Sequence, residues 1–447
     1  MSRQLQARVP RGMRDILPET MIRRQYVIDL VVKVFEEFGF EPLQTPSFEL
    51  AETLLGKYGP EAEKLIYQAQ HPGGKEELAL RYDLSVPLCR LMAMHRGQLR
   101  LPFKRYHIAP VWRAERPQRG RYREFYQCDI DIVGTTSLLA DAEIVQVIHA
   151  LLTRLGFSDF TIHLNSRKIL NGIGRYSGVP AEKLASLYRS IDKLDKIGME
   201  RVQQELMNNQ IPSPAISRLS KLLQIEGKGR TLLDRLKKEL AQDPEGQQGI
   251  ADLEEVLGHL KALGVPDKQL QVQSSMVRGL DYYDGIIYET SIEEAKMPSI
   301  TGGGRYDKLI GLFMKDSLPA VGTSFGIERI IDAMQELNMF PDSVRPTVVQ
   351  ALVTLFGPEQ ASYSLHAAQR LRQAGIHTEL YFEAASLKSQ FKYANRKGIP
   401  CVVVIGPDEA QQGRVTVRNF STGQQVQLSL SEMAPQIRNW VHDQASG

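Results

Sequence analysis

The stretch RGRYREFYQCDIDIVG, residues 119–134, constrains the fold more than any other part of this chain. Its side chains alternate with the period of two that is typical of a β-strand. The odd positions are nevertheless polar or aromatic, and they carry Arg121, Arg123, Phe125, Gln127, Asp129 and Asp131. Such a strand fits either an exposed sheet face crossed by salt bridges or the floor of a binding site.

A second strand is predicted just before it, in FKRYHIAPVWRAE, with the short loop RPQRG between the two. On a symmetric register Arg113 lies opposite Arg123, at a distance of about 5 Å. Two guanidinium groups so close repel unless an anion lies between them, and phosphate matches their geometry. Phe125 then offers a flat ring, and Gln127 and Asp131 offer acceptors farther along. This order favours an adenylate-like ligand.

Three other segments carry polar side chains beside predicted turns. MVRGLDYYDGIIYE, residues 276–289, contributes Arg278, Asp281, Tyr282 and Tyr283. In LRYDLSVPLCR, Asp83 and Ser85 share one side if the segment is extended. GTSFGIERI combines glycines, which would let the backbone approach a ligand, with Arg329 at a helix start. Each segment also has an ordinary alternative: core tyrosines, a helix cap, or a glycine turn with a surface Glu–Arg pair.

Length, charge and cysteine content narrow the class of protein. A chain of 447 residues is too long for one ordinary core and predicts two to four domains. The net charge of +3 neither demands nor excludes a nucleic acid partner. Three widely spaced cysteines argue against a disulfide framework or a zinc site and for a reducing compartment. We see no apolar leader and no run of 18 apolar residues, so we expect a cytoplasmic protein without a membrane span.

The pattern along the chain predicts a mixed α/β protein with four segments. A helix is predicted at 19–38, and glycine-rich turns are predicted in TGGGRYD. Beyond the linker FPDSVRP, strands alternate with helices, which indicates a small α/β domain with a largely parallel sheet. The predicted segments are a first catalytic part at 1–165, a helical insertion at 166–262, a second catalytic part at 263–338, and a C-terminal domain at 345–447.

In their order, these segments resemble the class II aminoacyl-tRNA synthetases, and specifically the histidyl-tRNA synthetase family. GFEPLQTPSFEL is similar to motif 1, WRAERPQRGRYREFYQCDID to motif 2 and GTSFGIERI to motif 3. RGLDYYDGIIYE and TGGGRYDKLI are similar to the two histidine-specific signatures, and the likeness covers nearly the whole chain. The resemblance implies an α+β catalytic domain with an antiparallel sheet, a helical insertion, and a C-terminal α/β anticodon-binding domain.

The resemblance also implies a role for each matching residue at the ATP site. Arg113 resembles the arginine that holds the α-phosphate, and Arg278 the arginine beside the reacting carboxylate, so these two are the expected catalytic residues. The other expected ATP contacts are Glu115 at the adenine amino group, Phe125 stacked on adenine, and Arg121 and Arg329 near the outer phosphates. Mg²⁺ is expected to bridge those phosphates without a metal site built by the protein.

A second set of matching residues implies a pocket for L-histidine. Asp83, Ser85 and Gln127 match the residues that hold the ammonium and carboxylate groups. Asp131 and Tyr283 match the pair that reads the imidazole, and Tyr282 lines the same pocket. Many bacterial members have Glu, Thr and Glu where this chain has Asp83, Ser85 and Asp131, and each change keeps the functional group.

The same resemblance implies a cognate tRNA(His) and a second copy of the chain as partners. Arg116, Gln118 and Arg119, in the motif 2 loop, suit the acceptor end of the tRNA. The segment LKSQFKYANRK suits unpaired anticodon bases, because it joins aromatic rings to Lys388, Lys392, Arg396 and Lys397. Motif 1 implies a homodimer. The alternatives are a non-catalytic paralogue (the regulatory subunit of ATP phosphoribosyltransferase, or an RNA sensor) and a class II synthetase for proline, threonine or glycine.

Overall fold

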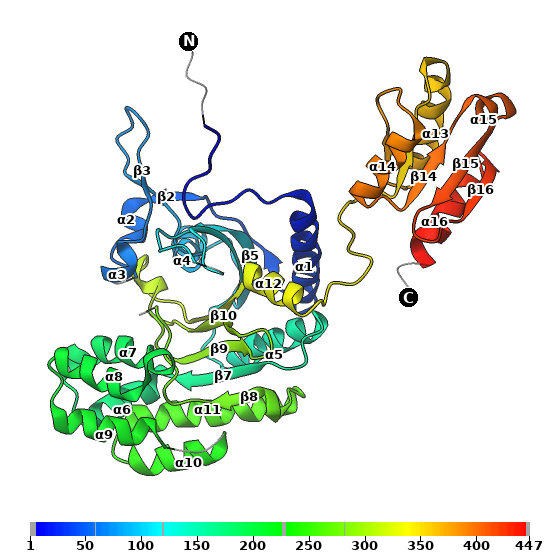
Figure 1. Ribbon diagram of the computed structural model, residues 1–447. Helices are drawn as coiled ribbons and strands as arrows, with labels where there is room; N and C mark the ends of the chain where they lie inside the picture. The colour runs from blue at the N-terminus through cyan, green and yellow to red at the C-terminus, as the bar shows by residue number, and fades with distance from the viewer. Residues whose placement is uncertain (1–5, 59, 119, 226–228, 281, 444–447) are drawn as a thin grey trace. The chain divides into compact units, whose positions relative to one another are not determined.

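The computed structural model describes residues 6–58, 60–118, 120–225, 229–280 and 282–443, and Figure 1 shows their helices and strands. The described chain forms two compact units. One contains residues 6–14 and 27–338, and the other contains residues 15–26 and 339–443. Each unit has its own sheet.

The first unit is built on an eight-stranded sheet in the order β1-β5-β6-β11-β10-β9-β7-β8. From β5 to β7 every neighbouring pair is antiparallel, whereas the short edge strands β1 and β8 pair in parallel with β5 and β7. The strand bounds are β1 (Glu41–Pro42), β5 (Phe103–Trp112), β6 (Glu124–Val133), β7 (Thr161–Ser166), β8 (Leu270–Val272), β9 (Ile286–Ile292), β10 (Met297–Arg305) and β11 (Ala320–Gly326).

The hairpin of β5 and β6 has the symmetric register predicted from the sequence. Trp112 pairs with Glu124, and the Arg113 amide donates to the Arg123 carbonyl at 2.9 Å. The predicted clamp of two arginines around one anion is wrong for Arg123, however. Its guanidinium donates to the main-chain carbonyls of Glu115 (3.0 Å) and Arg11 (3.4 Å), so main-chain oxygens rather than phosphate offset its charge.

The two faces of this sheet differ, because alternate residues of a strand point to opposite sides. The even face of β6 is apolar, with Cys128 and Ile130 fully buried. Helix α1 (Pro18–Glu37) packs on that face, where the Phe35 ring lies 5.4 Å from the Phe325 ring and 5.9 Å from the Tyr106 ring. The odd, polar face of β6 is therefore on the opposite side of the sheet from α1.

The glycine-rich turns predicted in TGGGRYD are wrong, because Gly302, Gly303 and Gly304 lie inside strand β10. They pair with β11 on one side and β9 on the other. A side chain at Gly303 would place its Cβ atom 2.1 Å from the Gly322 carbonyl oxygen. The strand needs glycine for close packing rather than for a change of direction.

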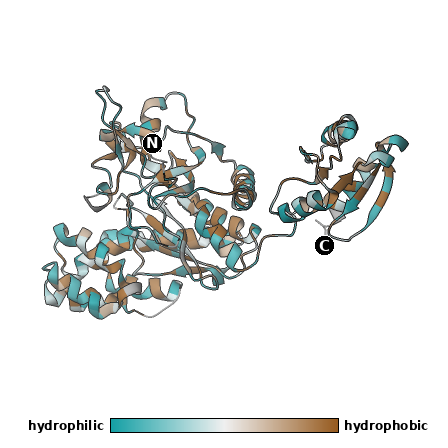
Figure 2. Cartoon of the chain, turned by 45° about the horizontal axis from the view of Figure 1, so that its top comes forward, coloured by the Kyte–Doolittle hydropathy of each residue, from teal (hydrophilic) through white to brown (hydrophobic). Residues whose placement is uncertain are grey.

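Helices α6 to α11 occupy the chain between β7 and β8, from Arg167 to Ala262. Apolar residues such as Leu219, Leu233 and Leu253 face inward from them and are buried, and Figure 2 shows these helices alternating in hydropathy. Their bounds are α6 (Arg167–Ser177), α7 (Leu184–Ile191), α8 (Leu194–Asn208), α9 (Ser213–Leu223), α10 (Arg230–Glu239) and α11 (Pro244–Ala262).

The remaining elements of the first unit surround the sheet. The strand β11 runs directly into helix α12 (Ile327–Glu336), as the sequence predicts. A small antiparallel sheet contains β2 (Phe48–Leu50), β4 (Leu78–Leu80) and β3 (Gln68–Ala69). The other helices are α2 (Ala51–Leu54), α3 (Pro60–Glu63), α4 (Ser85–His95) and α5 (Leu138–Arg154), with short 3-10 turns at Ala181–Lys183, Asp267–Gln269 and Ile310–Leu312.

The second unit has a five-stranded sheet in the order β13-β12-β14-β15-β16. The expectation of a largely parallel sheet is only half right, because β14 pairs with β15, and β15 with β16, in antiparallel fashion. The strand β16 was not predicted. The elements are β12 (Ala351–Val353), α13 (Ala361–Gln373), β13 (Thr378–Leu380), α14 (Leu387–Lys397), β14 (Cys401–Val404), α15 (Pro407–Gln412), β15 (Arg414–Asn419), β16 (Gln425–Ser429) and α16 (Met433–Asp443), with a 3-10 turn at Pro358–Gln360.

Candidate active site

The odd face of β6 forms a buried polar floor together with its two neighbouring strands. On β5, Arg105 lies opposite Asp131 and His107 lies opposite Asp129. On β11, Ser324 lies opposite Asp129. All of these side chains except Ser324 are less than 4% exposed. The floor is therefore the interior of a site and not an exposed sheet face.

Asp131 is fixed at one end of this floor. Its carboxylate forms an ion pair with Arg105 at 2.6 Å and accepts a hydrogen bond from the Tyr306 hydroxyl. A Cβ atom on Gly322 would lie 2.0 Å from the Asp131 Oδ1 atom, so glycine at 322 makes room for the carboxylate. Burial raises the pKa of Asp131, whereas the charge of Arg105 and the Tyr306 hydrogen bond lower it.

Asp83 and Ser85 lie across the site at the start of α4. The Asp83 carboxylate accepts hydrogen bonds from the Tyr58 hydroxyl (2.8 Å), the Val86 amide (3.1 Å) and the Tyr282 hydroxyl (3.4 Å). The bond from Val86 ties Asp83 to the first turn of α4, whose N-cap residue is Leu84 and not Asp83, and the bond from Tyr282 joins Asp83 to the site. Tyr282 also lies 3.5 Å from the Ser85 hydroxyl.

Three tyrosine rings connect the Asp83 side to the Asp131 side. The rings of Tyr282 and Tyr283 are 4.8 Å apart, and Tyr306 lies 5.8 Å and 6.4 Å from them. All three hydroxyl-bearing side chains come from the chain around β9 and β10, about 200 residues after Asp83. Tyr282 and Tyr283 are thus brought together with Asp83, Ser85 and Asp131, as the resemblance implies.

Several buried polar atoms of the floor have no hydrogen-bond partner among the described residues. Gln127 donates to Ser324 at 3.0 Å, but its Oε1 atom is unpartnered. The others are Asp129 Oδ1, both ring nitrogens of His107, and Arg105 Nε and Nη1. An unsatisfied buried polar group costs about 1–3 kcal/mol. Such a concentration on one surface is typical of a site that binds a polar ligand.

The opposite end of the floor carries the arginines and the ring predicted for ATP. The Arg113 guanidinium stacks on Tyr82 (4.4 Å) and on Phe125 (5.1 Å). Arg278 forms an ion pair with Glu289 at 3.1 Å and lies against Gly302, where a Cβ atom would be 2.1 Å from Arg278 Nη2. Arg113 and Arg278 thus flank the same buried floor from different segments.

The three remaining residues predicted for ATP lie around the motif 2 loop. Glu115 and Arg121 form an ion pair at 2.9 Å with the Arg121 side chain 48% exposed. Arg329 donates to the Gly120 carbonyl at 3.4 Å and to the Ser299 carbonyl. Burial and the nearby charge of Arg121 lower the pKa of Arg329. Arg121 and Arg329 therefore both lie beside Gly120, the first as the next residue of the chain and the second through its hydrogen bond.

The predicted tRNA contacts lie in both units. Arg116 and Gln118 are exposed in the loop between β5 and β6, whereas Arg119 lies outside the described residues, as does Asp281. On α14, Lys388, Lys392 and Arg396 are exposed at a spacing of four residues. Lys397 differs, because it is half-buried and forms an ion pair with Glu379.

Sequence reasoning missed several residues of the site, namely Arg105, His107, Asp129 as a pocket residue, Tyr58, Glu289 and Tyr306. For the residues of β5 the signal was present, since FKRYHIAPVW alternates as β6 does and the correct register places Arg105 and His107 beside Asp131 and Asp129. Tyr58 and Glu289 gave no comparable signal.

Burial and the charges of Arg105 and Arg81 lower the pKa of His107 to about 3, so this imidazole is neutral.

Replacing Asp129 by asparagine is expected to stabilise the ligand-free protein at pH 8 more than at pH 5. Burial raises the pKa of Asp129 to about 7, well above the ordinary value of 3.8 for an aspartate. The folded state therefore binds more protons than the unfolded state between these values, and stability falls as the pH rises through this window. Thermal unfolding should show a melting temperature several degrees higher for Asp129→Asn at pH 8. An equal shift at both pH values would contradict this assignment.

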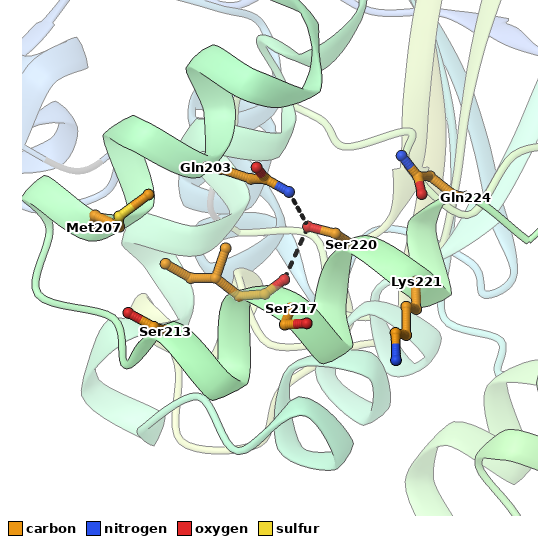
Figure 3. Close-up of a pocket in the computed structure, with 8 residues that line it drawn as sticks. Gln203, Met207, Ser213, Ser217, Ser220, Lys221 and Gln224 are labelled. Carbon is orange, nitrogen blue, oxygen red and sulfur yellow. Dashed lines mark hydrogen bonds between the residues drawn. The ribbon is translucent and has the colours of Figure 1, made fainter.

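A separate hollow of about 420 Å³ lies between α8 and α9 (Figure 3). In it, Gln203 donates to the Ser220 hydroxyl at 2.9 Å, and that hydroxyl donates to the Ile216 carbonyl at 2.9 Å. No atom that lines this hollow is among the buried unpartnered atoms of the described residues, in contrast to the floor of the main sheet.

Two further features concern metals and membranes. In the described parts of the chain, no group of three or more His, Cys, Asp or Glu side chains could hold a metal ion. A search of the same residues finds no helix with the length and apolar character needed to span a bilayer.

The floor of the antiparallel sheet carries arginines and an aromatic ring at one end and carboxylates at the other. This is the architecture of a class II aminoacyl-tRNA synthetase. A family model described as histidyl-tRNA synthetase matches residues 12–330, and one described as an anticodon binding domain matches residues 350–440. The chain belongs to the histidyl-tRNA synthetase family.

Individual relatives agree over nearly the whole length. The histidine–tRNA ligase of Porphyromonas gingivalis is 43% identical over 441 residues, which cover 94% of this chain and 96% of that protein. The crystal structure of histidyl-tRNA synthetase from Nostoc sp. PCC 7120 has a TM-score of 0.83 and 32% identity, and it covers 98% of this chain and 100% of that one. A Bacillus halodurans structure described as an ATP phosphoribosyltransferase regulatory subunit/histidyl-tRNA synthetase shares the fold, with a TM-score of 0.74 at 21% identity and coverage of 88% and 98%.

Proposed function

We propose that this chain is a histidine–tRNA ligase that activates L-histidine with ATP and then transfers histidine to the 3′ end of tRNA(His). The observation that carries the proposal is the floor of β5 and β6, where buried polar atoms lack partners between two arginines and two carboxylates. An amino acid and ATP together supply the charges and hydrogen-bonding groups that this surface lacks. The family assignment and the similarity to histidine–tRNA ligases support the same reaction.

In the first step, a carboxylate oxygen of histidine attacks the α-phosphorus of ATP, and the bond to the β-phosphate oxygen breaks to release pyrophosphate. Negative charge increases on the α-phosphate oxygens in the transition state, so fixed cations there lower the barrier. Arg113 and Arg278 serve this role. Stacking on Tyr82 and Phe125 holds Arg113 in place. Arg278 is held by its ion pair with Glu289, and the absence of a side chain at Gly302 leaves room for its guanidinium.

The carboxylate end of the floor provides the specificity for histidine. Asp83, Ser85 and Gln127 hold the ammonium and carboxylate groups, and Tyr282 closes the pocket over Asp83. Asp131 and Tyr283 bind the two imidazole nitrogens. A side chain without hydrogen-bonding atoms would leave the hydrogen bonds that these two buried groups offer to the ligand unmade, which disfavours it strongly.

The test is ATP–pyrophosphate exchange by the purified protein with each of the twenty amino acids. We expect exchange with histidine alone. Exchange with proline, threonine or glycine would identify a different class II synthetase. No exchange with any amino acid, from folded protein, would identify a non-catalytic paralogue, although the presence of Arg113 and Arg278 and the match to an anticodon binding domain favour an enzyme.

ATP is the nucleotide substrate in this proposal, and Mg²⁺ enters the site on its phosphates. The positive groups Arg121 and Arg329 then bind the outer phosphates, and Glu115 binds the adenine amino group. We also propose that residues 1–165 and 263–338 form the catalytic domain, 166–262 the insertion, and 345–447 the anticodon-binding domain. Omission of Mg²⁺ with chelation of residual ions should stop exchange, whereas undiminished exchange would contradict this role of the cation.

Replacing Lys392 by alanine is expected to weaken tRNA aminoacylation without changing pyrophosphate exchange. Lys392 is exposed in the middle of α14, between Lys388 and Arg396, and none of the three is ion-paired among the described residues. Loss of one contact to the nucleic acid should raise the KM for tRNA by about three- to tenfold and reduce its salt dependence.

The matched control for Lys392 is Asp408→Ala, an exposed charge at the start of α15 in the same unit. It should leave the KM for tRNA within twofold of the wild-type value. An unchanged KM for tRNA in Lys392→Ala would exclude α14 from the interface. Arg116, Gln118 and Arg119 are proposed to contact the acceptor end, where their variants should affect transfer of histidine rather than exchange.

We propose a homodimer formed through motif 1. Three exposed apolar side chains support this proposal, namely Phe48 (49%), Leu50 (40%) and Met94 (66%). Phe48 and Leu50 lie on the exposed side of β2, and Met94 is on α4, which an ion pair of Arg90 with Glu49 at 2.6 Å joins to β2. Exposed apolar side chains are common at interfaces. Light scattering should give about twice the 50.4 kDa of one chain, and a monomer mass would contradict the proposal.

We propose the cytoplasm as the location of this protein. Cys89 and Cys401 are buried free thiols, as expected in a reducing compartment. Fractionation of cells that express the full chain should recover it with cytoplasmic markers, and recovery with membranes or in the medium would contradict this location.

A further inference from the structure

Arg105 is a fully buried arginine that the predicted roles do not use. Its side chain is 0% exposed, and its Nη2 atom contacts the Asp131 carboxylate at 2.6 Å and donates to the Leu84 carbonyl at 3.2 Å. Leu84 lies between Asp83 and Ser85, so this one guanidinium joins both sides of the histidine pocket. Its Nε and Nη1 atoms have no partner among the residues that the structure describes.

Arg105 lies among three buried carboxylates, those of Asp83, Asp129 and Asp131. It forms the ion pair with Asp131, whereas the charge of Arg113 also acts on Asp83 and that of Arg81 on Asp129. His107 beside it is neutral. A carboxylate buried without a cation becomes protonated. Burial raises the pKa of Asp131 as it does that of Asp129, and the ion pair with Arg105 opposes this rise at Asp131 and favours the ionised carboxylate.

The orientation of Asp131 is fixed in the same way. Arg105 contacts Oδ2, Tyr306 donates to Oδ1, and Gly322 leaves space for the group. Both oxygens are held, yet each keeps a second lone pair that an imidazole N–H can use. An ionised Asp131 can only accept hydrogen bonds, so it selects a side chain that presents a donor at that point.

We propose that Arg105 is a positioning residue for histidine recognition: it keeps Asp131 ionised and fixes its orientation, and it acts through Asp131 without touching the imidazole. The proposal rests on the proposed function, because it takes Asp131 as the group that reads the imidazole. A buried ion pair is weak support for stability, since apolar residues of similar volume often replace one without loss. A role in substrate selection explains why a guanidinium occupies this position.

The experiment compares Arg105→Met with the wild type in pyrophosphate exchange, varying histidine and ATP separately. The KM for histidine should rise by about 30-fold or more, and the KM for ATP should stay within threefold, because Arg105 is at the opposite end of the floor from Arg113 and Phe125. Arg105→Lys, which keeps the charge, should recover most of the loss. A change of less than threefold for histidine, or an equal rise for ATP, would overturn the proposal.

The pH profile gives a second readout that a purely structural role would not change. The groups that face Asp131 are Arg105 from β5, Asp129 from β6, Asp83 and Cys89 at α4, Tyr288 from β9, and Tyr306 after β10. Removing Arg105 raises the pKa of Asp131, so the defect of Arg105→Met should be largest at low pH and shrink as the pH rises. A defect that is constant from pH 6 to pH 9 would contradict the mechanism.

A double variant keeps the proposal testable if Arg105→Met fails to fold. Arg105→Met with Asp131→Asn removes the two members of this buried ion pair together, so Asp131 is not left as a charged carboxylate without Arg105. If Arg105 acts only through Asp131, the KM for histidine in this double variant should lie within about twofold of that in Asp131→Asn alone. Additive losses would overturn the proposal.

Exchange by the wild-type protein distinguishes failure of the proposed function from failure of the positioning role of Arg105. If the wild type shows no exchange, the function is wrong, and calorimetric titration of free histidine then measures recognition directly. Weaker histidine binding in Arg105→Met would still support the positioning role, and unchanged binding, or no binding by the wild type, would overturn it.

Discussion

Replacing Arg278 by alanine is expected to reduce histidine-dependent pyrophosphate exchange by about 10³-fold or more. Arg278 is one of the two cations proposed for the α-phosphate, and its side chain is only 20% exposed. A charge in such a water-poor place acts more strongly on a developing negative charge than it would in water. The loss should appear mainly in kcat, because the interaction strengthens in the transition state.

The control for Arg278 is Arg154→Ala. Arg154 also pairs with one glutamate, Glu37, at 3.0 Å, but both side chains are 42% exposed and the pair is at the surface. Exposed pairs contribute about 0–1 kcal/mol, so activity and stability should be nearly unchanged. Retention of more than a tenth of wild-type exchange by folded Arg278→Ala would remove this arginine from the catalytic role.

Replacing Gly302 by alanine is expected to abolish exchange while leaving the protein folded. The new Cβ atom would lie 2.1 Å from Nη2 and 2.4 Å from Cζ of Arg278. These atoms are at the free end of a flexible side chain, so the guanidinium moves away and the sheet remains intact. The expected loss in kcat is about as large as that of Arg278→Ala, and circular dichroism should show an unchanged fold. Activity within tenfold of the wild type would contradict this account.

Neighbouring glycines serve as controls for this prediction. At Gly303 a Cβ atom would lie 2.1 Å from the Gly322 carbonyl oxygen and 2.7 Å from the Thr323 Cα atom. The main chain of a central strand cannot move aside, so Gly303→Ala should destabilise the protein by about 3 kcal/mol or more. At Gly258, on α11, a Cβ atom meets nothing within 4 Å, so Gly258→Ala should keep full activity and increase stability by up to about 1 kcal/mol.

The sequence was most informative where structure is local. The short loop between β5 and β6 fixes the register, because the two strands must pair symmetrically about it, and the ladder follows the prediction from Trp112 to Phe103. Helix α1 differs from the predicted range by one residue at each end. The helical run between β7 and β8 begins at Arg167 and ends at Ala262, as its composition indicates.

The sequence was least informative where segments distant along the chain meet. Gln127 bonds to Ser324, 197 residues later, and Tyr282 bonds to Asp83, 199 residues earlier. Periodicity shows which side of a strand a residue occupies, but not which strand lies next to it. The resemblance to a known family supplied these groupings for the predicted residues. The resemblance did not supply Arg105, His107 or Tyr306. It also did not show that the Arg123 guanidinium donates to main-chain carbonyls.

By itself the sequence determined the polar face, the register of its hairpin and the helices on either side, because each depends on neighbouring residues and on the periods of strand and helix. Only the tertiary structure decided that the three glycines of β10 lie in a strand, since their need for glycine comes from Gly322, Arg278 and Tyr283 on other segments. It also decided which charges are balanced. Burial raises the pKa of both Asp129 and Asp131, and Arg105 opposes that rise at Asp131 through an ion pair, because burial and distance between side chains, which no local pattern records, set the electrostatic free energy of each group.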